Sequence, residues 1–315
     1  MVHYMRLFPF QVLLAFLLFS GCSVKKIAIN SVADALSGEG STVFTGDNDP
    51  QLVADALPFA LKMYETMLEQ TPEHAELHLA TGKAFTLYSY AFVQGPAAQL
   101  PDEKISTRKK MNQRAKKLFL RGRNYILTGL DINHPGFRDA LRQSADSALA
   151  MTTEADTAFL YWAGASWMGA LTTDKFNLGL LMSMPKAVAF VEKCMEYNPA
   201  FGEGSCHEFF ISYYGSIPPS MGGSEQKARE HFKKAVELSQ GSKASPYMSL
   251  ATSVCVKKQY KEEFIQLMKK ILSIDVDAYP RNRLLNIISR RRAEWMLAHI
   301  DNFFLPEEKG AEIEQ

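Results

Sequence analysis

Residues 160–167 read LYWAGASW, and residues 187–199 read AVAFVEKCMEYNP. In the first stretch, apolar and small residues recur at intervals of three and four, the spacing that places side chains on one face of a helix. The second stretch has a similar spacing and ends at Pro199, which stops a helix. Gly164 lets a second helix approach closely, while the ring of Trp167 fills the space beside it. The two stretches therefore predict a pair of packed helices.

Further stretches repeat the second-helix spacing, at 60–72, at 228–240 and, poorly, at 263–270. These stretches resemble the helix pairs of tetratricopeptide repeats. The distance between them is irregular, and residues 94–104 and 174–184 read as inserted loops. We therefore expect an all-α fold, a degenerate tetratricopeptide-like array of helix pairs with flanking helices over residues 50–304. A generic helical bundle with chance spacing is the alternative.

Composition excludes several classes of protein. The chain has 315 residues, of which 47% are hydrophobic, so it buries a sizeable core and is not disordered as a whole. Lys and Arg total 35 against 34 Asp and Glu, and this balance argues against a bulk nucleic-acid binder. Four Cys are too few for a disulfide scaffold.

The N-terminus has the features of an export signal. Arg6 precedes a short, largely apolar run over 7–19, which is too short to span a bilayer. The sequence FSGC at 19–22 resembles the lipobox of bacterial lipoproteins, in which the Cys is acylated after cleavage. We expect a signal peptide over 1–21, an acylated Cys22, a tether over 22–49 and an acidic tail over 305–315. An ordinary secretory signal is the alternative.

The order of several stretches resembles one family, the TRAP-transporter-associated TPR lipoproteins (the T component, TatT). The stretches are DPQLV at 49–53, ALPFALK at 56–62, YAFV at 90–93, LFLRG at 118–122 and LYW at 160–162. The resemblance implies a protein on the periplasmic side of the bacterial envelope, anchored in the membrane by its lipid. We further expect a hydrophobic or organic-acid ligand between the repeats, while the resemblance implies docking to the substrate-binding protein of a tripartite ATP-independent periplasmic transporter. It implies no enzymatic activity and no cofactor.

Residues 108–123 contain eight Lys or Arg residues and no acid. On a helix these cations surround a narrow apolar stripe, which predicts a surface for an acidic partner protein, an anionic ligand or an anionic lipid surface. A solvated helix face whose charges are answered by acids on neighbouring helices is the alternative. The candidate binding residues are Arg114, Lys116, Lys117, Arg121 and Arg123.

Aromatic residues are dense on three predicted helices. Most are expected in the core, because aromatic rings dominate helix packing. Those within 85–92 occupy more than one helix face, however, so some must line a groove, a pore or an interface. The candidates for such a lining are Tyr88, Phe92, Trp162, Trp167 and Tyr213.

Catalytic and metal motifs are scarce. His74 and His78 have a spacing that suits a metal, but a solvated first helical turn is the better interpretation, and no metal site is expected. Cys206 and His207 are adjacent, so on a helix they point about 100° apart and do not form a nucleophile and base. Cys194 and Cys206 lie on consecutive predicted helices, where a disulfide or two free thiols are both compatible with the spacing, with free thiols favoured.

Two other functions fit an anchored array of helices. An envelope-assembly scaffold would bind assembly proteins, and a stand-alone carrier of hydrophobic ligands would retain a small molecule without a protein partner. A homo-oligomer is also expected, with a trimer as the working hypothesis, while nucleic acid is not an expected partner.

Overall fold

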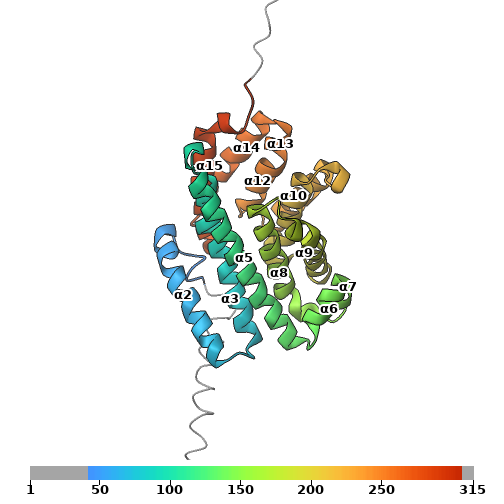
Figure 1. The fold of residues 1–315 in the computed structure, drawn as a ribbon. Helices are drawn as coiled ribbons and strands as arrows, with labels where there is room; N and C mark the ends of the chain where they lie inside the picture. The colour runs from blue at the N-terminus through green and yellow to red at the C-terminus, as the bar shows by residue number, and fades with distance from the viewer. Residues whose placement is uncertain (1–41, 307–315) are drawn as a thin grey trace, which may run out of the picture.

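The computed structural model describes residues 42–306, which form helices joined by short turns with no strand among them (Figure 1). The prediction of an all-α fold is confirmed. The longer helices are α2 (Pro50–Gln70), α3 (Ala75–Tyr88), α5 (Ile105–Asn133), α8 (Thr157–Thr173), α9 (Leu178–Tyr197), α10 (Phe201–Ser216), α11 (Glu225–Leu238), α14 (Lys261–Leu272) and α15 (Arg283–Ala298). The shorter ones are α4 (Gly95–Ala98), α6 (Phe137–Gln143), α7 (Ala145–Leu149), α12 (Ser245–Leu250) and α13 (Val256–Lys258), and π-helical turns span Ser89–Gln94 and Ala251–Cys255.

Helix α2 begins where the sequence predicts a cap. The Asp49 carboxylate accepts hydrogen bonds from the backbone N–H groups of Gln51 and Leu52, at 2.9 and 3.2 Å, and Pro50 occupies the first turn. Such a cap contributes about 1 kcal/mol to helix stability. It fixes the start of the helical domain.

Helix α5 lies at the centre of the N-terminal half of the fold. It packs against α3 on one side and α8 on the other, and α8 packs in turn against α9 (Figure 1). Glycines make the closest crossings: a Cβ atom on Gly82 of α3 would lie 2.6 Å from the carbonyl oxygen of Gly122 on α5. Similarly, a Cβ on Gly164 of α8 would lie 2.5 Å from the Val191 side chain on α9. The predicted packing of the helix at 160–167 against the helix at 187–199 is therefore confirmed.

The C-terminal half adds α10 to α15 around a second apolar cluster that includes Phe264 and Ile271, both fully buried. Helix α15 also contacts the N-terminal end of the described chain. The backbone N–H of Leu284 donates to the Thr45 carbonyl at 2.9 Å, and Arg283 donates to the Gly46 carbonyl at 3.0 Å. These bonds tie the N-terminal end of the described chain to the start of α15.

The expectation of two inserted loops is wrong. Most of 94–104 is in helical turns, which include α4 and a 3-10 turn at Asp102–Lys104. Most of 174–184 is helical, because the Asn177 side chain caps α9 by accepting the N–H of Leu180 at 3.0 Å. The tetratricopeptide-like description and the domain bounds stay predictions. The signal peptide, Cys22 and most of the tether lie outside the described residues, as does most of the acidic tail. Within 42–306, no helix is long and apolar enough to cross a membrane.

Candidate functional site: a basic face on helix α5

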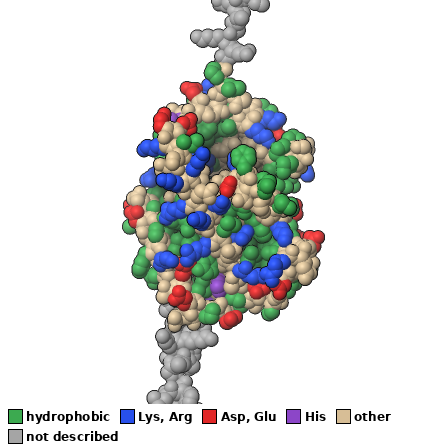
Figure 2. All heavy atoms as spheres, in the orientation of Figure 1, with side chains coloured by type: hydrophobic (Ala, Val, Ile, Leu, Met, Phe, Trp, Pro, Cys, Tyr) green, Lys and Arg blue, Asp and Glu red, His purple; other side chains and the backbone are tan. Residues whose placement is uncertain are grey.

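The cations of 108–123 lie on α5, which runs across the face of the molecule seen in Figures 1 and 2. Figure 2 shows Lys and Arg side chains gathered where α5 and its neighbours form this surface. The apolar stripe of α5 faces inward, with Ala115 and Phe119 buried. The cations therefore occupy the outward side of the helix. We call this surface the basic face.

Three of these cations have carboxylate partners on other segments. Lys116 Nζ lies 2.7 Å from an Asp174 oxygen, and its hydrogen bond lowers the pKa of Asp174. Arg121 pairs with Glu65 of α2. Arg108 lies 3.0 Å from Asp102. At these three positions the alternative interpretation is correct: acidic residues on neighbouring segments form ion pairs with the cations.

Lys109, Lys110 and Lys117 behave differently. All three are exposed, and none has an ion pair or side-chain hydrogen bond with any residue in 42–306. An exposed cation without a partner keeps its field available to an approaching molecule. These three lysines are therefore the electrostatic part of a candidate docking surface.

Two arginines of α5 lie over aromatic rings. The Arg114 guanidinium is 5.6 Å from the centre of the Tyr88 ring and donates to the Tyr88 hydroxyl at 3.2 Å. The Arg123 guanidinium is 4.6 Å from the centre of a Trp167 ring. Burial lowers the pKa of Arg123 to about 10, and the nearby charge of Arg138 adds to that shift. The structure thus brings predicted binding residues onto predicted lining residues.

The aromatic candidates divide by burial. Tyr88 and Trp167 are 8% and 7% exposed, and the Trp167 indole N–H donates to the Ser183 hydroxyl at 2.8 Å. Phe92, Trp162 and Tyr213 are partly buried at the edge of the core. The rings of Tyr88 and Trp167 lie beneath the guanidinium groups of Arg114 and Arg123. Whether any of the five lines a groove or a pore stays a prediction.

An exposed apolar segment lies beside α5, and sequence reasoning missed it. Phe176, Leu178 and Met182 are 93%, 74% and 82% exposed, and we call them the apolar tip. The Lys116–Asp174 ion pair holds the start of this segment against α5. The signal was present in the sequence as apolar residues in a stretch read as a loop. Exposed apolar groups of this kind mark interaction surfaces.

The histidine and cysteine candidates do not come together as a metal site in the described residues. The His74 side chain caps α3, while His78 is buried and its Nε2 lies 2.9 Å from the Pro72 carbonyl. We expected His78 to lie in a solvated helical turn. It is buried instead, because the first turn of α3 packs against the α2–α3 connection. No group of three His, Cys, Asp or Glu side chains suited to a metal occurs within 42–306.

The Cys206 and His207 side chains point to different partners, as helix geometry predicts. Cys206 is buried with its Sγ 3.2 Å from the Sγ of Cys194, and both are free thiols in the structure, as is the buried Cys255. The thiol contact and burial raise the pKa of Cys194. His207 faces His231 of α11 instead. Buried thiols with raised pKa values are poor nucleophiles.

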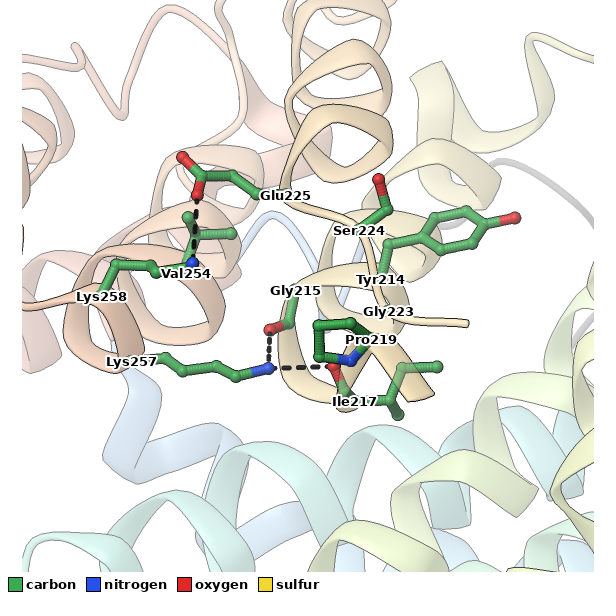
Figure 3. Close-up of a pocket in the computed structure, with 10 residues that line it drawn as sticks. All are labelled: Tyr214, Gly215, Ile217, Pro219, Gly223, Ser224, Glu225, Val254, Lys257 and Lys258. Atoms are coloured by element: carbon green, nitrogen blue, oxygen red, sulfur yellow. Dashed lines mark hydrogen bonds and ion pairs between the residues drawn. The ribbon is translucent and has the colours of Figure 1, made fainter. Parts of the chain in front are cut away.

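A small pocket of about 100 Å³ lies between the end of α10, the start of α11 and the α12–α13 segment (Figure 3). The Lys257 amine reaches into it but is already bonded to the carbonyls of Gly215, Ser216 and Ile217. Lys258 is 3.9 Å from Glu225 on another wall. The pocket is smaller than a usual small-molecule site of about 300–1,000 Å³. It does not compete with the basic face as the main candidate site.

Within 42–306, the helical fold presents a basic face and an apolar tip, and such surfaces are typical of proteins that bind other molecules. Comparison with known families agrees. A family model described as TRAP transporter T-component matches residues 46–304. A protein of Treponema pallidum (strain Nichols), named only "Uncharacterized protein", is 31% identical over 306 residues, covering 92% of this chain and 95% of the relative. The chain belongs to the TRAP transporter T-component family.

Membership of this family confirms the predicted resemblance and gives a coarse function. The chain is a component associated with a TRAP transporter, and the family is not an enzyme family. A TRAP transporter component works at the cell envelope.

Proposed function

We propose that this protein docks the periplasmic substrate-binding protein of a TRAP transporter through the basic face and the apolar tip. The observation that carries the proposal is that three exposed lysines without a partner in 42–306 lie on α5, the same helix whose Lys116 pairs with Asp174 at the start of the exposed apolar tip. Lys109, Lys110 and Lys117 supply long-range attraction for an acidic partner. The apolar tip supplies side chains that a partner pocket buries.

The remainder of the chain serves this docking in the proposal. Residues 1–21 act as a signal peptide, and acylated Cys22 anchors the tether over 22–49 in the membrane. The helical domain over 50–304 has a tetratricopeptide-like arrangement. Confining the domain to the membrane surface raises its effective concentration near the transporter. A hydrophobic or organic-acid ligand, and a homotrimer, belong to the same hypothesis.

The first test is a pull-down from solubilised envelope with the full-length chain as bait, read by mass spectrometry. Near-stoichiometric recovery of a solute-binding protein supports the proposal. Recovery of outer-membrane or cell-wall assembly proteins favours the scaffold hypothesis instead. A small molecule retained through purification, with no protein partner, favours the stand-alone carrier.

The second test locates the surface with purified partner. The triple variant Lys109→Glu, Lys110→Glu, Lys117→Glu is expected to weaken binding at least tenfold at low salt, and Phe176→Asp to weaken it at any salt. The matched control is Lys233→Glu, Lys269→Glu, Lys270→Glu, which changes the net charge equally at exposed lysines of α11 and α14. Equal loss in both triple variants would reduce the basic face to a general charge effect.

A further inference from the structure

Cys194 and Cys206 form a pair of thiols that the proposed function does not use. Cys194 lies on α9 and Cys206 on α10, the next helix along the chain (Figure 1). Their sulfur atoms are 3.2 Å apart, and both residues are fully buried in the larger apolar cluster. Cys255 is buried in the second cluster, where it has no thiol neighbour from 42–306. Cys255 is therefore an internal control for the pair.

The two sulfurs lie closer together than two unbonded atoms of their size prefer. Optimal contacts between carbon atoms are at about 3.5–4.0 Å, and sulfur is larger than carbon, so thiols at 3.2 Å are crowded. In a disulfide the S–S bond is about 2.05 Å long. The sulfurs need to approach by only about 1 Å to form that bond, which would relieve the crowding.

The connection between the two cysteines contains a turn that needs support. Residues 202–204 all lie in the left-handed region, with φ angles of 55°, 55° and 90°. Glu203 is one of them, and a residue other than Gly stays in this region only where surrounding contacts hold it. On one side, the Lys243 amine donates to the Gly202 carbonyl at 3.0 Å. A bond between the two buried sulfurs would close the same turn on the side of the core.

A metal site does not explain the pair, because no group of three His, Cys, Asp or Glu side chains suited to a metal occurs in the described residues. Disulfides form and persist in oxidising compartments such as the bacterial periplasm. A TRAP transporter component works at the cell envelope. The inference therefore rests on export, which belongs to the proposed function, but it does not depend on docking.

We propose that Cys194 and Cys206 are joined by a disulfide in the exported protein. The oxidant is a protein or small-molecule disulfide of the envelope. One thiolate of the pair attacks this disulfide, so a mixed disulfide forms and one thiol of the oxidant leaves. The other thiolate then attacks the cysteine sulfur of the mixed disulfide, and the second thiol of the oxidant leaves. The pair loses two protons and two electrons, and the oxidant is reduced to two thiols.

The exchange takes place while the chain folds, because the packed helices seal both thiols from solvent. The bond joins residues that are 12 positions apart and so restricts the unfolded chain. It also fixes α10 against α9. Helix α10 contributes Phe210 to the larger apolar cluster and Ile211 to the second one. The disulfide thus stabilises the helix at which the two halves of the fold meet.

The first test maps the thiols of the full-length protein taken directly from the envelope. Cells are quenched in acid, and the unfolded chain is treated with N-ethylmaleimide, reduced and then labelled with iodoacetamide. Peptide mass spectrometry should find the second label on Cys194 and Cys206 in most molecules and the first label on Cys255. An unreduced digest identifies the linked peptides. The first label on both members of the pair, or a bond from either of them to Cys22 or Cys255, would overturn the proposal.

The second test refolds the purified, reduced chain with reduced and oxidised glutathione, and in parallel with tris(2-carboxyethyl)phosphine. The glutathione sample should lose the mass of two hydrogen atoms and unfold at least about 5 °C higher than the phosphine sample. In the double variant Cys194→Ala, Cys206→Ala the two media should give the same thermal midpoint. The matched control Cys255→Ala should keep the parental difference.

The outcomes of the refolding test are separate from those of the docking tests. A parent chain that forms no bond in glutathione, or a difference between the media that persists in the double variant, would overturn the disulfide. Loss of the difference in Cys255→Ala would assign it to the wrong cysteine and would also overturn the proposal. A bonded pair in a protein that does not bind a solute-binding protein would count against the proposed docking and support the disulfide.

Discussion

His207 Nδ1 on α10 lies 2.8 Å from His231 Nδ1 on α11, with the ring centres 5.0 Å apart. These distances fit a hydrogen bond in which one Nδ1–H donates to the other nitrogen, so at least one ring must be neutral. His231 also stacks on Tyr214, and Lys227 and Glu230 lie in its surroundings. Burial, and then the charge of His207, lower the pKa of His231 to about 4, while burial and Lys234 lower that of His207.

This pair predicts acid sensitivity. A group whose pKa is lowered by folding stabilises the native state above its unfolded value, near 6.5, and that stability is lost as the pH falls towards 4. After allowance for solvent at a half-buried ring, we expect a loss of roughly 2 kcal/mol. His231→Phe keeps a ring and removes the titration. Urea unfolding at pH 7 and pH 4.5 should show a smaller loss in His231→Phe, and the parental loss in the exposed control His299→Gln.

The α8–α9 crossing predicts that Gly164→Ala destabilises the protein. Its new Cβ would lie 2.5 Å from the Val191 side chain and 2.8 Å from the Ala187 carbonyl, so the helices must separate. We expect a loss of about 1–3 kcal/mol, even though Ala favours helix formation. Gly179→Ala on α9 is the control, because its nearest contact would be 3.5 Å away. Chemical denaturation should show a loss at Gly164 and none at Gly179. Equal results would mean that the crossing is looser than it appears.

Trp167 is a core residue in the structure, which gives a stability test of its role. It is 7% exposed, contacts Phe190 at 6.3 Å between ring centres and donates to Ser183. Trp167→Ala should therefore lower the free energy of unfolding by roughly 3–5 kcal/mol, and Trp167→Phe by clearly less. Calorimetry or urea unfolding measures both. A negligible loss in Trp167→Ala would return this residue to an exposed lining.

The sequence predicts the helix pair well because its signal is local. Gly164 and Pro199 show by type and spacing where helices approach and where one ends, and Asp49 marks a helix start. The family resemblance adds the transporter association. The beginning of α9 was missed because exposed apolar side chains, such as Phe176 and Leu178, stand beside the buried Leu180 and obscure the helical spacing of the buried residues. Which apolar side chains become buried and which stay exposed depends on tertiary contacts, and the spacing of residues in a single sequence does not show these contacts.

The basic face shows the same limit. Eight cations without an acid between them indicate a charged helix, but they do not indicate which of the cations form ion pairs. Lys116 and Arg121 are paired with Asp174 and Glu65, which lie 58 and 56 residues away in the sequence, whereas Lys117 is not paired within 42–306. Such relationships need the fold.

Charge reversal on α5 should separate folding from docking. Arg121→Glu places a carboxylate beside the largely buried Glu65, so we expect a loss of about 1–2 kcal/mol in stability. Lys117→Glu, at an exposed position without an ion-pair partner in 42–306, should change stability by less than about 0.5 kcal/mol. Urea unfolding gives both values, and titration with the substrate-binding protein gives the affinities. Lys117→Glu should weaken docking with stability unchanged. Unchanged affinity at low salt would make the lysine a solvated surface residue.

The proposed lipid anchor at Cys22 predicts where the protein is found after cell fractionation. Each acyl methylene that enters the bilayer contributes about 0.8 kcal/mol, and two or more chains hold a protein stably where one does not. Cys22→Ser removes the only residue that the lipobox resemblance marks for acylation, so the variant should move to the soluble envelope fraction. Its thermal midpoint should equal that of the parent, because Cys22 precedes the helical domain. The control is Cys255→Ser, a buried thiol, which should stay with the membrane. A Cys22→Ser protein that remained in the membrane fraction would show that another segment or a partner holds it there.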